Sequence, residues 1–162
     1  MIHFTCQPII NGLGHALDKL KGRLTKDYKM SQFTWFRTGG LAAYLFQPQD
    51  EDDLIYFLSI LPIEVPVFVV GLGSNLLIRD GGFDGVIIRL SVKGFGNIEQ
   101  VSQTKISAGA ITPVKRLAAK ARDFALGGFH FYHGIPGTVG GALRMNAGAH
   151  GTDTSELVKE VY

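Results

Sequence analysis

The chain has 162 residues, about the length of one ordinary domain. Hydrophobic residues make up 46% and charged residues 19%, a balance that excludes a disordered chain. The net charge of +2 is too small to indicate a nucleic-acid partner. The longest apolar run, residues 54–63, is too short to cross a bilayer, so we expect no membrane partner. The single cysteine, Cys6, and the absence of a signal-peptide pattern favour the reducing cytoplasm.

The first half of the chain alternates helical and strand patterns. Leucines recur at helical spacing over residues 13–24 and predict an amphipathic helix. A short aromatic run over 32–40 ends at two glycines, and residues 42–48 predict a strand. Asp50 occupies the position of a helix N-cap, with acidic residues in the first turn, and predicts a helix that follows it.

Short β-branched runs follow this helix. Residues 66–70 predict a buried strand, and residues 85–90 predict another. The β-α-β order predicts a small sheet with helix cover. Residues 105–110 give a weaker strand pattern.

The next helix is predicted over residues 112–128. Thr112 has the position of the N-cap and Pro113 that of the first helical residue, while two glycines suit the C-terminal cap. The predicted buried face consists of Val114, Leu117, Ala118, Ala121 and Ala125.

Strand-helix order begins again near residue 92. This pattern predicts an N-terminal helical segment over 1–31, a first subdomain over 32–91 and an incomplete second subdomain over 92–162. The chain ends on "LVKEVY", which is typical of the start of a strand, so we expect a protein truncated at its C-terminus.

Ten of the 21 glycines lie in two stretches, "VFVVGLGSNLLIRDGG" (67–82) and "GIPGTVGGALRMNAGAHG" (134–151). Backbone N–H groups in a glycine turn form an anion-binding nest, to which Ser74 and Asn75 add side-chain donors. The first stretch therefore suits a phosphate or pyrophosphate. It is not a P-loop, because no Gly-Lys-Ser/Thr follows. It is not a Rossmann fingerprint either, because Leu76 occupies the third glycine position of that motif. A purely structural turn is the alternative.

The second stretch combines a bare backbone with apolar side chains. A flat heteroaromatic ring with an anionic tail would need this mixture of apolar contact and backbone donors, and the alternative is a tightly packed structural turn. We expect three glycines to form a wall without side chains and with free N–H groups: Gly137, Gly140 and Gly141. The apolar residues are Ile135, Pro136 and Val139.

Other chemistries have weaker support in the sequence. His130 and His133 have no third ligand nearby, so we expect no metal site. Ser74 lacks the context of a hydrolase nucleophile. Aromatic residues are not interleaved with basic ones, which argues against nucleic-acid binding.

Three motifs in this order and spacing, "TWFRTGG", "VFVVGLGSNLLIRDGGFDGVII" and "GIPGTVGGALRMNAGAHG", closely resemble the UDP-N-acetylenolpyruvoylglucosamine reductases (the MurB family), flavoenzymes of peptidoglycan precursor synthesis. The resemblance covers residues 32–157. It implies an α+β fold, the FAD-binding domain of the vanillyl-alcohol-oxidase (PCMH) type, with two small α+β subdomains and FAD between them.

The resemblance also implies which residues contact non-covalently bound FAD. Those matching the pyrophosphate loop are Gly71, Gly73, Ser74, Asn75 and Leu76. Those matching the stretch beside the flavin are Ile135, Pro136, Gly137, Thr138, Gly140, Gly141 and Ala142. Its continuation towards the isoalloxazine and the substrate is matched by Asn146, Gly148 and Ala149.

In the family, NADPH reduces FAD, and reduced flavin passes hydride to the enolpyruvyl double bond of a nucleotide sugar, giving UDP-N-acetylmuramate. The resemblance thus implies small-molecule partners and no obligatory protein partner. The family's catalytic arginine, serine and glutamate would lie beyond Tyr162, so we expect no catalytic residue here and no activity of this chain alone. His150 stands where the family often has tyrosine.

Two alternatives remain open. The chain could belong to another flavin oxidase or dehydrogenase of the same fold that acts on a hydroxy acid or alcohol, or it could be a non-catalytic nucleotide-binding fragment. Such oxidases often have Gly-Gly-His in the pyrophosphate loop, whereas this chain has Ser74 and Asn75, which favours the reductase.

Overall fold

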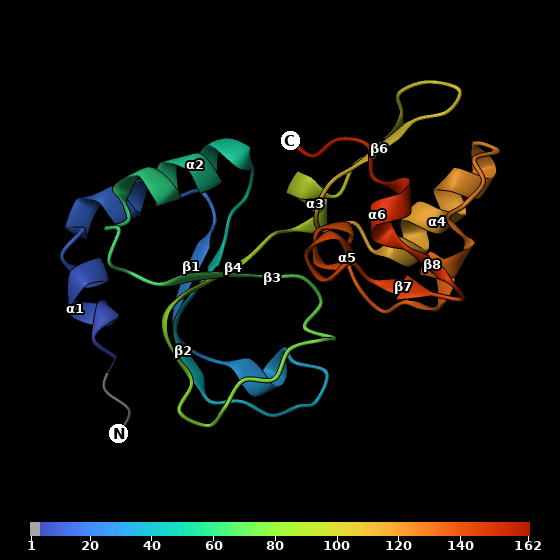
Figure 1. Cartoon of the computed structure of the whole chain (residues 1–162). Helices are drawn as coiled ribbons and strands as arrows, with labels where there is room; N and C mark the ends of the chain where they lie inside the picture. The colour runs from blue at the N-terminus through green and yellow to red at the C-terminus, as the bar shows by residue number, and fades with distance from the viewer. Residues whose placement is uncertain (1–3) are drawn as a thin grey trace. The chain divides into compact units, whose positions relative to one another are not determined.

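The computed structural model describes residues 4–162. The chain divides into two compact units, one up to Gly94 and one from Phe95 to Tyr162 (Figure 1). The boundaries expected at 31/32 and 91/92 from the sequence stay predictions.

The first unit is built on a mixed four-stranded sheet with the order β1-β2-β4-β3. Strand β1 is antiparallel to β2, whereas β2 and β3 both pair in parallel with β4. The elements are α1 (Cys6–Asn11), η1 (Gly14–Lys19), β1 (Arg23–Lys29), η2 (Met30–Gln32), β2 (Leu41–Gln47), α2 (Glu51–Ile60), β3 (Val67–Val70), β4 (Phe83–Arg89) and, at the unit boundary, α3 (Val92–Phe95).

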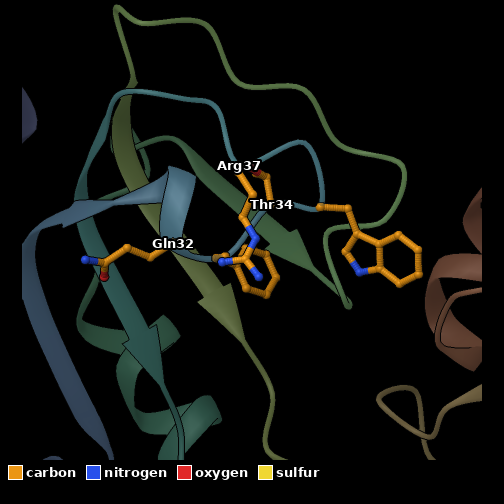
Figure 2. A pocket seen from close by; sticks show the side chains of 5 residues that line it. Gln32, Thr34 and Arg37 are labelled. Atoms are coloured by element: carbon orange, nitrogen blue, oxygen red, sulfur yellow. The ribbon is translucent and has the colours of Figure 1, made fainter.

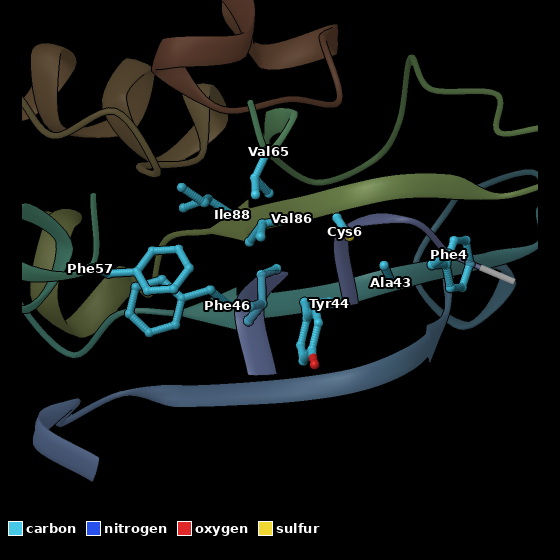
Figure 3. Packing of buried hydrophobic residues seen from close by; sticks show 10 residues of the cluster. Phe4, Cys6, Ala43, Tyr44, Phe46, Phe57, Val65, Val86 and Ile88 are labelled. Carbon is cyan, nitrogen blue, oxygen red and sulfur yellow. The ribbon is translucent and has the colours of Figure 1, made fainter. Parts of the chain in front are cut away.

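The sheet buries a different hydrophobic cluster on each face. In β4, Val86 and Ile88 join one cluster and Ile87 joins the other, as the two-residue period of a strand requires. The first cluster packs helices α1 and α2 on the sheet, and Figure 3 shows Phe46 of β2 beside Phe57 of α2. The second cluster is covered by loop residues instead of long helices. This face of the sheet is therefore covered by loops and by the short 3-10 helix η2, which contributes Met30.

The start of α2 confirms the predicted cap. The Asp50 carboxylate accepts a hydrogen bond from the Asp53 N–H at 2.9 Å. Asp53 is itself buried, and its carboxylate accepts the N–H groups of Lys21, Gly22 and Gln49 at 2.8–2.9 Å. These three bonds satisfy the charge and hold the entry to β1 against the start of α2.

The amphipathic helix predicted over 13–24 is wrong from Leu20 onward, and its earlier part is a 3-10 helix. A short 3-10 helix, η1, ends at Lys19, and Leu20 adopts extended backbone before β1 begins at Arg23. Gly22 lets the chain approach β2 closely, because a Cβ there would lie 2.3 Å from the Gln47 carbonyl oxygen, and Arg23 then pairs with Gln47. Pairing with β2 therefore outweighs the helical leucine spacing.

Strand β3 forms where it was predicted, but it is not fully buried. Val67, Phe68 and Val69 are exposed, and Val70 alone of the strand is buried. The reason is the strand order, since β3 lies at the edge of the sheet and pairs with β4 only.

The second unit contains two small antiparallel ladders and a helical core. The strands form the pairs β5–β6 and β7–β8. The elements are β5 (Ile98–Gln100), β6 (Ile106–Ala108), α4 (Val114–Asp123), η3 (His130–Gly134), α5 (Val139–Met145), β7 (Gly148–Ala149), β8 (Thr152–Asp153) and α6 (Thr154–Leu157). The core gathers Val114, Leu117, Phe131, Tyr132 and Ala142.

Helix α4 confirms the predicted element, with different ends. It begins at Val114, and the Thr112 hydroxyl donates to the Asn97 carbonyl instead of capping the helix. It ends at Asp123, because Ala125 adopts a left-handed conformation (φ 55) and Leu126 N–H donates to the Ala121 carbonyl, a Schellman-type ending. Ala125 is consequently exposed and does not belong to the buried face.

The strand expected to begin in residues 157–162 is not formed. Residues Thr154–Leu157 form α6, and no strand is assigned to residues 158–162. Among residues 4–162, no helix has both the length and the apolar character needed to cross a bilayer.

Candidate functional site

The first glycine stretch leaves the sheet at the end of β3. Gly73 is buried and has a left-handed backbone (φ 69), which confirms the expected need for glycine at this turn. A Cβ at Gly73 would lie 2.9 Å from a Phe33 ring carbon and 3.2 Å from the Phe33 carbonyl oxygen. The turn is therefore bare because a second loop packs directly against it.

The remaining residues of the turn differ in exposure. Asn75 is exposed and Ser74 is partly buried. Leu76 is partly buried against the second hydrophobic cluster, so its side chain anchors the turn to the sheet. Gly71, which begins the turn, is partly buried.

The loop against Gly73 comes from the aromatic run between β1 and β2. Trp35 N–H donates to the Gly73 carbonyl at 3.2 Å. The loop is held by buried Thr34, whose hydroxyl donates to the Thr38 carbonyl at 2.7 Å and whose carbonyl accepts the Arg37 N–H at 3.1 Å. The loop and the glycine turn therefore form one local structure.

This loop encloses a polar hollow of about 290 Å³ (Figure 2). The lining residues are Gln32, Phe33, Thr34, Trp35 and Arg37. Sequence reasoning assigned no site residue to this loop. The available signal was the quoted motif "TWFRTGG", an aromatic run with an arginine that stops at two glycines.

The second glycine stretch has its donors engaged within the protein. Gly140 N–H donates to the Ala110 carbonyl at 2.8 Å, and Gly141 N–H donates to the Thr138 hydroxyl at 3.2 Å. The expectation of free N–H groups is wrong for both residues. A Cβ at Gly140 would lie 3.1 Å from the Ala110 Cβ, so this glycine permits close packing.

The residues around these glycines differ in solvent exposure. Gly137 is partly buried with open space where a Cβ would lie, and its carbonyl accepts the Val114 N–H at 3.1 Å. Ile135 is partly buried and Pro136 is exposed, whereas Thr138 and Ala142 are buried. Thr138 is the N-cap of α5.

The continuation of this stretch forms a helix end and a hairpin. Asn146 closes α5 with a left-handed backbone (φ 45), and its side-chain oxygen accepts the Ser155 N–H at 2.9 Å. Gly148 and Ala149 form β7, and the turn to β8 places His150 in the left-handed region (φ 57). The Asn146 side chain therefore has a structural role.

No group of three His, Cys, Asp or Glu residues within the described part of the chain could hold a metal ion. His130 and His133 both lie on η3 and are exposed. The two glycine stretches themselves belong to different units, the first to the unit up to Gly94 and the second to Phe95–Tyr162.

Comparisons with known proteins found one family model and solved structures that match this chain. A family model described as "FAD binding domain" matches residues 42–162. The solved structure of UDP-N-acetylenolpyruvylglucosamine reductase (MurB) from Thermus caldophilus is 30% identical with a TM-score of 0.63 and is matched by 83% of this chain. This chain spans only 45% of that protein, less than half its length. A cholesterol oxidase mutant from Brevibacterium sterolicum is 12% identical over 86% of this chain and 27% of its own, with a TM-score of 0.56, and shares the fold.

Proposed function

The chain belongs to the family of FAD-binding domains, and from this premise we propose that it is the FAD-binding part of an NADPH-dependent reductase that converts UDP-N-acetylglucosamine enolpyruvate to UDP-N-acetylmuramate. The proposed setting is peptidoglycan precursor synthesis in the cytoplasm. The observation that supports the reductase most is the 30% identity to the Thermus caldophilus enzyme over 83% of this chain.

The residues of the first unit fit the diphosphate of FAD. The turn at Gly73 offers backbone without side chains, and Phe33 fills the volume behind it. Backbone amides in such a turn suit the oxygens of a diphosphate, which need several donors at close range. We propose Gly71, Gly73, Ser74, Asn75 and Leu76 as this contact.

The residues proposed to lie beside the flavin belong to the second unit. The resemblance implies these residues, which are Ile135, Pro136, Gly137, Thr138, Gly140, Gly141, Ala142, Asn146, Gly148 and Ala149. Because the N–H groups of Gly140 and Gly141 are bonded internally, these two glycines would give close packing and not hydrogen bonds to the flavin. Backbone near Gly137, which has open space at its Cβ position, is the better candidate for direct contact.

When bound, FAD would supply the redox chemistry of the reaction. This chain's residues would bind and orient it. Asp84 and Asp153, two acids near the glycine stretches, already hold the starts of helices α1 and α6 through hydrogen bonds to backbone N–H groups. We therefore propose no catalytic acid or base among the residues of this chain.

The proposal is tested by titrating the chain with FAD and following both flavin and tryptophan fluorescence. We expect saturable binding and complete release of flavin on acid denaturation, because no histidine or cysteine lies in either glycine stretch ahead of His150. Flavin that remains with the precipitated chain would contradict non-covalent binding. A chain that folds and shows no FAD binding would contradict the proposed function of this chain.

A further inference from the structure

The polar hollow of residues 32–37 lies against the proposed diphosphate turn. Its volume of about 290 Å³ is at the lower limit of small-molecule pockets, which hold about 300–1,000 Å³. That size suits part of a ligand and not a whole dinucleotide. Phe33 and Trp35 join the hollow to Gly73, one by ring contact and the other by a backbone hydrogen bond.

Arg37 supplies a positive charge to this hollow, and Figure 2 shows its side chain projecting from the loop into it. Its backbone is left-handed (φ 57), a conformation that is costly for arginine and is held here by the turn that buried Thr34 forms. The loop therefore holds the Arg37 backbone in an energetically unfavourable conformation.

A second guanidinium lies close by. The Arg89 guanidinium stands over the Phe33 ring, 4.5 Å from its centroid. Among residues 4–162, the salt bridges involve neither Arg37 nor Arg89. In this part of the structure neither guanidinium forms an ion pair with a carboxylate, and Arg37 is the charged residue that lines the hollow.

We propose that Arg37 is a diphosphate-binding residue that adds a full positive charge to the backbone donors of the Gly73 turn. Backbone N–H groups carry only partial charges, whereas guanidinium matches the oxygens of a phosphate and is always protonated. This proposal rests on the proposed binding of FAD, and it adds a residue outside both glycine stretches to that site.

The test compares Arg37→Gln with Arg37→Lys in the full chain. Both replacements keep a Cβ and an unbranched stem, so the backbone cost at this position stays the same. We expect Arg37→Gln to bind FAD about tenfold more weakly, the loss of one charge-assisted contact, and Arg37→Lys to lose less. Arg23→Gln is the control, because Arg23 is an exposed arginine of β1 in the same unit.

Three ligands separate the possible outcomes. FAD and ADP carry the diphosphate and riboflavin does not. The chain has one tryptophan, Trp35, and it lines the hollow, so its fluorescence reports on ligands there. The affinity of the wild type for FAD should also fall more steeply with salt than that of Arg37→Gln.

Selective loss of FAD and ADP binding, with riboflavin binding unchanged, supports Arg37 as a diphosphate contact. Unchanged FAD affinity and salt dependence in Arg37→Gln would overturn it. Equal loss of FAD and riboflavin binding would overturn it as well, because Arg37 would then act through the fold. If the wild type binds ADP through Arg37 but no FAD, the inference stands and the proposed function fails.

Discussion

Gly73 is the residue whose conformation and packing together require glycine. Its φ of 69 disfavours any side chain, and the Phe33 ring occupies the space that a Cβ would need. Gly73→Val should therefore lose FAD binding by more than about tenfold, since the turn must move. Ser74→Ala should weaken binding by only about 1 kcal/mol, the value of one hydrogen bond.

Flavin content after purification in excess FAD measures both changes. Gly81→Ala is the matched control in the same stretch, because a Cβ at Gly81 meets no atom within 4 Å and its φ is not left-handed. Equal flavin content in wild type and Gly73→Val would exclude this turn as the diphosphate site.

Asp84 connects the N-terminal helix to the sheet. Burial alone would raise the pKa of its carboxyl, but hydrogen bonds from the Thr5 hydroxyl and from the Cys6 and Thr5 N–H groups outweigh burial and hold the pKa at about 2. Because the pKa is lower in the folded than in the unfolded chain, the charged form stabilises the fold above the unfolded pKa of 3.8. That contribution decreases as the pH falls through about 2.

Asp84→Asn should therefore lower the free energy of unfolding at pH 6 by at most about 2 kcal/mol, discounted for partial exposure. The difference from wild type should shrink as the pH falls from 3.8 and vanish below the folded pKa of about 2. Urea unfolding at several pH values measures it, and Asp80→Asn in the exposed turn is the control. A difference independent of pH would show that the charge of Asp84 is not the cause.

At the scale of the elements, an aromatic pair lies at the centre of the contact between helix α2 and the sheet. Phe57 is fully buried, and its ring centroid lies 4.1 Å from that of Phe46 in β2. Phe57→Ala should lower the free energy of unfolding by about 3–5 kcal/mol, because it leaves a cavity between helix and sheet.

Leu58 is the control on the same helix, since its side chain is 46% exposed. Leu58→Ala should cost less than about 1 kcal/mol in denaturant titration. Similar losses in both variants would mean that α2 is held by general apolar contact and not by the aromatic pair.

The ends of helices α2 and α4 show which sequence signals predict a helix boundary correctly. Asp50 begins α2 as its sequence predicted, because a cap acts within one turn of the helix. The end of α4 was predicted at glycines, yet Ala125 adopts the left-handed closing conformation. Its cost is offset by the backbone bonds that the closing turn forms, which the residue type does not reveal.

At the scale of the whole chain, we propose that none of its residues supplies the proton or the charge stabilisation of the reaction. Hydride addition to an enol ether leaves negative charge on carbon, which needs stabilisation and then a proton. In the described residues Asp84 and Asp153 are engaged in holding helix starts. We therefore expect no turnover by this chain, even when FAD is bound.

The measurement mixes the chain with excess FAD, NADPH and UDP-N-acetylglucosamine enolpyruvate. NADPH absorbance and product mass should match a control without protein. The Thermus caldophilus enzyme, of which this chain spans 45%, is the positive control. Lactyl product formed at a comparable rate would show that this chain contains the catalytic groups.

The sequence by itself determined the local features of this protein and its family. The strands near 42–48, 66–70 and 85–90, the cap at Asp50 and the left-handed glycine at position 73 follow from side-chain type and spacing over a few residues. The resemblance of three motifs, in their order and spacing, to a family of flavoenzymes indicated a flavoprotein. The family match over 42–162 agrees with that reading.

Only the tertiary structure decided which partner each backbone group takes. The chain pairs Arg23 with Gln47 in a strand where the leucine spacing indicated a helix, and it gives the Gly140 N–H to Ala110 instead of leaving it for a ligand. It also packs Phe33 behind Gly73 and places Arg37 in the loop that packs against that turn. The physical reason is distance along the chain: periodicity and caps report on neighbours within a turn or two, whereas these partners meet only after folding.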